Sequence, residues 1–126
     1  MESREELLRT VYAAFNRRDM DAVLALMRPD VDWPNGMEGG RVHGRDEVRA
    51  YWTRQWSMID PSVEPVRIHD DEADNTIVDV HQVIRDLSGK MLKDQIVQHV
   101  YSFRDGLIKR MDIRNPAAMA VQQAST

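Results

Sequence analysis

The chain has 126 residues, of which 42% are hydrophobic, and this length suits one compact domain but not two independent cores. Its formal net charge of −4, with arginines scattered among acidic residues, argues against nucleic acid and anionic membranes as partners. The lack of cysteine excludes disulfides, a thiolate nucleophile and cysteine-ligated zinc, and it fits a reducing compartment.

The beginning of the sequence predicts two helices. Ser3 and Glu6 have the spacing of a capping box, so a first helix should begin there and end near Arg17. Its apolar stripe consists of Leu7, Leu8, Val11, Tyr12 and Phe15. Asp19 can cap a second, short helix that Pro29 stops. The shared face of that helix carries Met20, Val23, Leu24 and Met27.

A brief strand and a third helix should follow. Residues 31–33 (VDW) are expected to form the strand, which a Pro-Asn-Gly turn ends. Residues 46–59 give the clearest amphipathic helix, and the Asp60-Pro61 pair should end it. Its apolar face carries Val48, Tyr51, Trp52, Trp56 and Ile59.

The segment after Pro61 has strand character. Turn signals at Asp74-Asn75, Ser88-Gly89 and Asp105-Gly106 divide it, which predicts three or four antiparallel strands joined by hairpins. Helices followed by a sheet indicate an α+β domain. We expect a single domain over residues 1–126, with a core from about residue 3 to 115 and a tail over 116–126.

The same residues indicate where the protein resides. The start, MESREE, alternates in charge, unlike a secretory apolar segment. No apolar run approaches the length of a membrane span. We therefore expect a cytoplasmic protein.

Four segments together resemble the nuclear transport factor 2-like superfamily, which includes ketosteroid isomerase, scytalone dehydratase, limonene epoxide hydrolase and the SnoaL-like polyketide cyclases. They are residues 12–19 (YAAFNRRD), 28–33 (RPDVDW), 42–48 (VHGRDEV) and 101–108 (YSFRDGLI). The resemblance implies a cone in which a strongly curved, mostly antiparallel sheet wraps three N-terminal helices. A cavity for a small molecule lies at the open end, and the outer sheet face often forms a homodimer.

Steroid isomerase activity is not implied, because each catalytic position of that enzyme differs here. Its oxyanion-hole tyrosine falls on Val11, its general-base aspartate on Trp33 and its protonated aspartate on His99. These positions line the cavity in the resembled family. We therefore expect ligand contacts from Trp33, Trp52, Tyr12, Phe15, Met27, Val83, Val97, Tyr101, Met111 and Ile113.

A hairpin turn over residues 86–90 suggests the catalytic groups. A three-residue loop would place Asp86 opposite Lys90. Asp79, His81 and Val83 would then share the concave face with Gln95, Val97, His99 and Tyr101. The expected catalytic residues are His99, His81 and Asp79, because imidazoles in an apolar cavity suit acid–base work near neutral pH.

Several alternatives stay open. Both histidines can be ordinary sheet residues that bond to backbone or water, and the tryptophans can be core. Asp79, His81 and His99 could form a facial metal triad, but their order is reversed and the resembled family has no general metal requirement. We expect no metal and no cofactor.

The expected function is that of a small-molecule pocket protein, an isomerase, dehydratase or cyclase using acid–base chemistry. The alternatives are a non-catalytic ligand-binding or dimerisation module and, ranked last, a protein-interaction role. A homodimer is expected because the outer sheet face appears apolar in the sequence pattern, carrying Val78, Val80, Ile84, Ile96 and Val100.

Overall fold

The computed structural model describes residues 3–114, so the predicted tail and residue 115 lie outside the described part. The helices are α1 (Arg4–Asn16), α2 (Met20–Leu24) and α3 (Arg45–Trp56). The strands are β1 (Met27–Pro34), β2 (Arg41–His43), β3 (Ile59–Asp70), β4 (Thr76–Asp86), β5 (Met91–Arg104) and β6 (Leu107–Arg114). Within residues 3–114 no helix is long and apolar enough to cross a bilayer.

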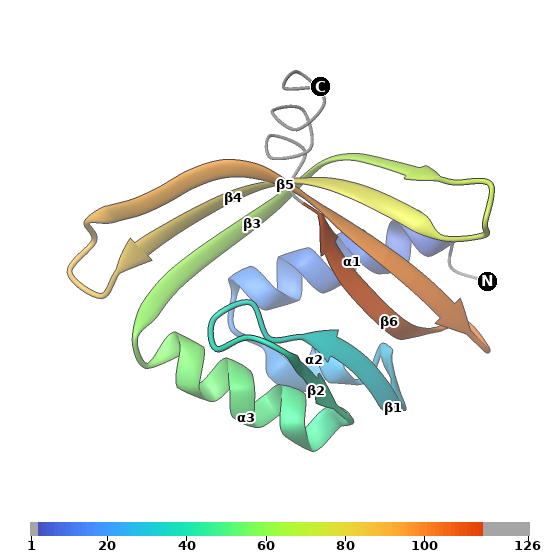
Figure 1. Ribbon diagram of the computed structural model, residues 1–126, viewed down its shortest axis with the longest axis horizontal. Helices are drawn as coiled ribbons and strands as arrows, with labels where there is room; N and C mark the ends of the chain where they lie inside the picture. Colours follow the sequence, from blue (N-terminus) through green and yellow to red (C-terminus); the bar gives the residue numbers. More distant parts are fainter. Residues whose placement is uncertain (1–2, 115–126) are drawn as a thin grey trace.

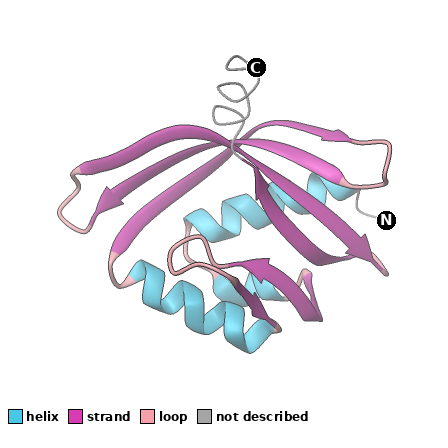
Figure 2. Ribbon diagram, in the orientation of Figure 1, coloured by secondary structure: helices cyan, strands magenta, loops and turns pink. Residues whose placement is uncertain are grey.

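The strands form one six-stranded sheet in the order β2-β1-β6-β5-β4-β3. All neighbouring strands are antiparallel except β1 and β6, which are parallel. The sheet arches over the three helices (Figures 1 and 2), and α1 packs on β3 while α3 packs on β1, β2 and β3. This curved, mixed sheet with helices on its concave side confirms the α+β class.

The helix caps form as the sequence predicts. The Ser3 side chain accepts a hydrogen bond of 3.1 Å from the backbone N–H of Glu6, and that of Asp19 accepts one of 3.2 Å from Ala22. Each cap satisfies a backbone donor that a helix terminus otherwise leaves unpaired. Both helices therefore begin where these short polar side chains stand.

The end of the second helix was predicted wrongly. α2 ends at Leu24, and Met27 already belongs to β1, where it pairs with Ile108. Its carbonyl oxygen also accepts a hydrogen bond of 3.0 Å from Arg45. Pro29 lies where the β1–β6 register shifts, so its missing N–H costs no ladder bond.

The third helix is also shorter than predicted, because Ile59 begins β3 instead of ending α3. Pro61 thus lies inside a strand, opposite Ile84. β3 is an edge of the sheet, and edge strands tolerate proline because one side of their ladder is unpaired. The pair Asp60-Pro61 marks a strand entry here.

The turn between β4 and β5 has the predicted form. The N–H of Asp86 donates to the carbonyl of Lys90 at 2.9 Å, and Gly89 has φ +96°. Beyond the turn, however, the register shifts: Arg85 pairs with Met91, whereas Ile84 pairs with Lys93. Leu92 is the extra residue of a β-bulge.

This bulge reverses the predicted faces of β4. Val78 pairs with His99 and Val80 with Val97, and directly opposed residues point to the same face. Consequently Val78 and Val80 are fully buried beneath the concave face. Residues 79, 81 and 83 turn to the convex face.

The predicted apolar outer face changes in the same way. Val78, Val80 and Ile84 belong to the concave face, and only Ile96 and Val100 of the five predicted residues lie on the convex one. Ile96 is 46% exposed there. The convex face is therefore a mixed polar and apolar surface.

Candidate functional site

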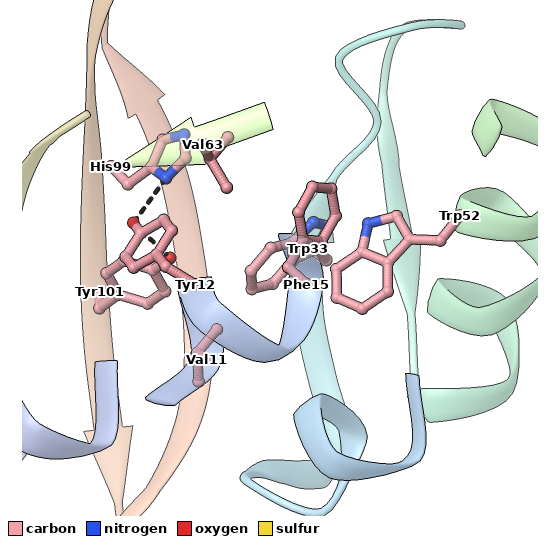
Figure 3. Close-up of a pocket in the computed structure, with 8 residues that line it drawn as sticks. All are labelled: Val11, Tyr12, Phe15, Trp33, Trp52, Val63, His99 and Tyr101. Carbon is pink, nitrogen blue, oxygen red and sulfur yellow. Dashed lines mark hydrogen bonds between the residues drawn. The ribbon is translucent and has the colours of Figure 1, made fainter. Parts of the chain in front are cut away.

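Two adjoining cavities lie between the helices and the concave face of the sheet. The inner cavity has a volume of about 50 Å³ and the outer one about 490 Å³. Both are lined by Phe15, Trp33, Trp52, Val63 and His99. Figure 3 shows the inner cavity, with Phe15, Trp33 and Trp52 on one side. His99, Tyr12 and Tyr101 lie on the other side.

Three aromatic side chains from three elements form one wall. Phe15 comes from α1, Trp33 from β1 and Trp52 from α3. The Trp52 ring lies edge-on to both of the others, with centroid distances of 5.3 Å to Phe15 and 5.6 Å to Trp33. Edge-to-face contacts fix these rings in place, so the wall presents a rigid apolar surface to a ligand.

The opposite side is a chain of buried hydrogen bonds. The Tyr12 hydroxyl of α1 lies 2.8 Å from His99 Nδ1 and 2.8 Å from the Tyr101 hydroxyl of β5 (Figure 3). His99 and Tyr101 are two residues apart on one strand, so both point to the same face. The Tyr12 ring also stacks on His99, with centroids 5.8 Å apart.

Burial controls the charge of these three groups. It lowers the pKa of His99 from 6.5 to about 4, since a cation loses its hydration in an apolar site. Burial also raises the pKa of Tyr101 and, together with the neighbouring Tyr101, the pKa of Tyr12. The chain is therefore neutral at physiological pH.

Counting protons assigns the histidine tautomer. If Tyr101 donates to Tyr12 and Tyr12 donates to His99 Nδ1, every hydroxyl proton has an acceptor. If Nδ1 instead carried the proton, Tyr12 would donate to Tyr101. The Tyr101 hydroxyl proton would then have no acceptor within residues 3–114. An unpaired buried donor costs about 1–3 kcal/mol. The accounting favours a proton on Nε2, the ring nitrogen that points away from Tyr12 in Figure 3.

The other two predicted catalytic residues lie on the opposite side of the sheet. His81 Nε2 is 2.6 Å from Asp94 Oδ1, and Asp79 accepts a hydrogen bond of 2.9 Å from Gln98. Both pairs are on the convex face, because the bulge shifts the register. The prediction that His81 and His99 share the concave face was wrong. Asp79, His81 and His99 lie on two faces of the sheet, so they cannot bind one metal ion together.

Of the predicted ligand contacts, Phe15, Trp33 and Trp52 line both cavities. The others line one cavity or neither. Tyr12 and Tyr101 line the inner cavity, and Val97, Met111 and Ile113 line the outer one. Val83 faces outward opposite Asp94, so its placement was wrong for the same reason as that of His81. Met27 is fully buried in the core and lines neither cavity, because it pairs with β6 at the far end of β1.

The predicted ligand contacts leave out the polar part of the outer cavity, although the sequence analysis placed Gln95 on the concave face. Its lining includes Tyr51 and Gln55 from α3 and Gln82, Lys93 and Gln95 from the sheet. Alternation along β5 was a usable signal, since residues 93 and 95 are in phase with 97 and 99. On α3, Gln55 follows Tyr51 by four residues and Trp52 by three, and these spacings bring it to the same side of the helix.

Comparison with known proteins identifies relatives of this fold. The SnoaL-like domain model matches residues 8–111. An NTF2-like protein of unknown function from Burkholderia pseudomallei is 27% identical, with 97% of each chain covered and a TM-score of 0.79. TerC, co-crystallised with polyporic acid, is 24% identical, with 93% of this chain and 95% of that chain covered and a TM-score of 0.76.

A third structure, named as a polyketide cyclase from Xanthomonas campestris, is 24% identical over 92% of this chain and 93% of its own, with a TM-score of 0.70. No curated protein matches the sequence. The family match covers most of the chain, including Tyr12, Trp33, Trp52, His99 and Tyr101. The chain belongs to the SnoaL-like domain family.

Proposed function

We propose that the protein binds a flat, mostly apolar small molecule and holds one oxygen of that molecule with the Nε2–H of His99. The observation that carries this proposal is the buried chain from Tyr101 through Tyr12 to His99. It leaves one free donor, on Nε2 of His99, and His99 lines both cavities together with Trp33 and Trp52. An outer cavity of about 490 Å³ has the size of small-molecule sites.

The chemistry that suits this donor is stabilisation of negative charge on a carbonyl or hydroxyl oxygen. A fixed hydrogen-bond donor in an apolar site stabilises an oxyanion strongly, because water does not compete and no reorganisation is needed. A neutral imidazole can serve in this role. Isomerisation, dehydration or cyclisation of a carbonyl compound passes through such an oxyanion, and this assignment accords with relatives named as polyketide cyclases.

A non-catalytic binding module is the second candidate, and one observation favours it. With His81 and Asp79 on the convex face, the only carboxylate lining the cavities within residues 3–114 is Asp112. It is bound by Arg110 and Arg41, and these contacts lower its pKa. A carboxylate held in this way is a weak general base.

Binding of matched probes tests the donor role. 4-Phenylphenol adds one hydroxyl to biphenyl, and quenching of the fluorescence of Trp33 and Trp52 reports their binding. We expect the phenol to bind the native protein about tenfold more tightly than biphenyl, which is the value of one good hydrogen bond. His99→Phe should abolish that difference while biphenyl still binds. Equal affinities for both probes in the native protein would refute the proposal.

Recovered ligand separates an enzyme from a binding module. Native mass spectrometry of the purified protein, followed by extraction, gives the mass of a bound metabolite. An enzyme should convert this compound or its precursor, and His99→Phe should lose that conversion. A compound that is released chemically unchanged, and is neither consumed nor formed, would support the binding module.

We also propose a homodimer through the convex face of the sheet. Its support is Ile96, which lies at the centre of the long strand β5 on the convex face and is 46% exposed. The same native mass spectra should show a dimer, and Ile96→Asp should convert it into a monomer. A monomer in the native protein at micromolar concentration would contradict this assembly.

A further inference from the structure

Strand β5 carries a graded series of side chains along the concave face. His99, Val97, Gln95 and Lys93 alternate with convex residues, and all four line the outer cavity. From first to last the series runs from a neutral donor through an apolar side chain and an amide to a cation. Six residues of strand span roughly 20 Å. Lys93 therefore stands at the end of the cavity opposite to the oxygen-binding end.

Lys93 is the unbalanced charge of this cavity. The cavity lining also includes Arg41 and Asp112, but these two are bonded to each other at 3.0 Å. Arg41 also bonds to Asp32, and Arg110 bonds to both Asp32 and Asp112. Two arginines thus neutralise two carboxylates.

Lys93 has no such partner in the part of the chain that the structure describes. Within residues 3–114, no carboxylate lies within ion-pair distance of its ammonium group. The neighbouring Asp94 points to the convex face, where it pairs with His81. The outer end of the cavity therefore carries a net positive charge that a ligand can neutralise.

Amide side chains line the middle of the outer cavity, where they can bond to polar groups of a ligand. Gln95 donates to Gln82 across the strands at 2.8 Å. On the facing helix, Gln55 donates to the Tyr51 hydroxyl at 3.3 Å, and its Oε1 is buried without a partner. Unpaired buried acceptors are rare, because each costs free energy unless a donor reaches it. A hydroxyl on a ligand would supply that donor.

We propose that the ligand is an amphipathic organic acid, whose oxygen-bearing aromatic end meets His99 and whose carboxylate lies against Lys93. Lys93 is then the residue that selects acids over neutral compounds. The proposal rests on the function proposed above, and it adds the charge and the orientation of the ligand. It predicts that the acid enters with its apolar end first.

One further probe of the same scaffold tests this proposal. 5-(4′-Hydroxybiphenyl-4-yl)pentanoate carries a carboxylate on a flexible chain at the end opposite to the hydroxyl, which lets it reach towards Lys93, and its primary amide is the matched neutral probe. We expect the pentanoate to bind the native protein about fivefold more tightly than its amide, the effect of a solvent-exposed ion pair. The difference should shrink in high salt, because exposed charges are screened.

Two lysine variants locate the effect. Lys93→Gln should remove the advantage of the carboxylate, so that the pentanoate and its amide bind equally. Lys109→Gln is the matched control, because it removes the same charge from an exposed position on β6 that lines neither cavity. It should retain the full advantage of the carboxylate.

The outcomes separate this inference from the proposed function. If 4-phenylphenol binds more tightly than biphenyl but the carboxylate adds nothing, the proposed function stands and the inference fails. The inference also fails if Lys109→Gln abolishes the advantage as completely as Lys93→Gln. If neither phenol binds better than biphenyl, the oxygen-binding role of His99 fails first.

Discussion

Protonation of His99 should couple the stability of this protein to pH in a narrow window. Burial lowers the pKa of His99 from 6.5 to about 4. Between these two values the unfolded chain binds a proton that the folded protein excludes. The free energy of unfolding therefore falls as the pH falls from 6.5 towards 4, and it is independent of this group above pH 7.

The size of the effect follows from the two pKa values. Each unit of pKa difference corresponds to about 1.4 kcal/mol. At pH 4.5, where the folded protein is only partly protonated, His99 should lower the free energy of unfolding by about 2.5 kcal/mol relative to pH 7. The carboxyl groups with lowered pKa, such as Asp112, lose their stabilising effect mainly below this window.

Urea unfolding followed by tryptophan fluorescence measures this dependence at several pH values between 7.5 and 4.5. His99→Gln keeps a hydrogen-bonding side chain but cannot take up the proton. The stability difference between the native protein and this variant should therefore shrink by about 2.5 kcal/mol on acidification. His99→Phe, which also lacks the titrating ring, is the control and should show the same pH dependence as His99→Gln.

Parallel pH curves for the native protein and His99→Gln would refute the reasoning, because His99 would then have the same pKa in both states. An independent reading comes from the NMR signal of the His99 ring Cε1–H in the folded protein. It should not titrate between pH 7 and 5. A midpoint near 6.5 would contradict the buried, neutral imidazole on which the proposed oxygen binding rests.

Three further predictions test the chain and the register. Tyr12→Phe should cost about 2–3 kcal/mol in urea unfolding, because it leaves two buried groups unpaired, whereas Tyr101→Phe removes only the terminal donor and should cost about 1 kcal/mol; equal costs would contradict the proton accounting. In the Ile96→Asp background, which removes the proposed contact between subunits, Val80→Ser should cost about 2–3 kcal/mol and Val83→Ser less than about 1 kcal/mol, and the reverse order would refute the register. Gln55→Leu should raise the free energy of unfolding by about 1 kcal/mol by removing the unpaired acceptor, as thermal unfolding would show.

The parts of the fold that local signals specify could be predicted from the sequence. Ser3 and Asp19 mark helix starts because a capping side chain acts on a backbone N–H three residues away. The turn at Gly89 was likewise predictable, since it depends on one residue that tolerates positive φ. Such signals do not depend on the rest of the chain.

The register of β4 against β5 could not be predicted in this way. The turn was correct, but Leu92 forms a bulge just beyond it, and one extra residue reverses every face along β4. Nothing in the local sequence marks the bulge. The reason becomes visible only in the folded protein, where the shift buries Val78 and Val80 and leaves the hydrogen-bonded pair of His81 and Asp94 on the convex face.

The candidate site was predictable to a similar degree. The positions of Trp33, Trp52 and His99 follow from the family resemblance, and all three line both cavities. The hydrogen bond from Tyr12 to His99 could not be foreseen, because it joins residues 87 positions apart. It depends on how closely α1 approaches β5, which packing of the whole core determines.

The loss of His81 from the pocket changes the kind of reaction that this site can support. If Nε2 of His99 gave up its proton, protons could follow along the chain from Tyr12 and Tyr101, and a tyrosinate would remain at its end. Burial raises the pKa of Tyr101, so that charge is strongly disfavoured. The chain can therefore polarise an oxygen, but it cannot supply a proton at neutral pH. Under the proposed function, a substrate must itself ionise readily, as a C–H between two carbonyls does, and its enolate is the species that His99 would stabilise.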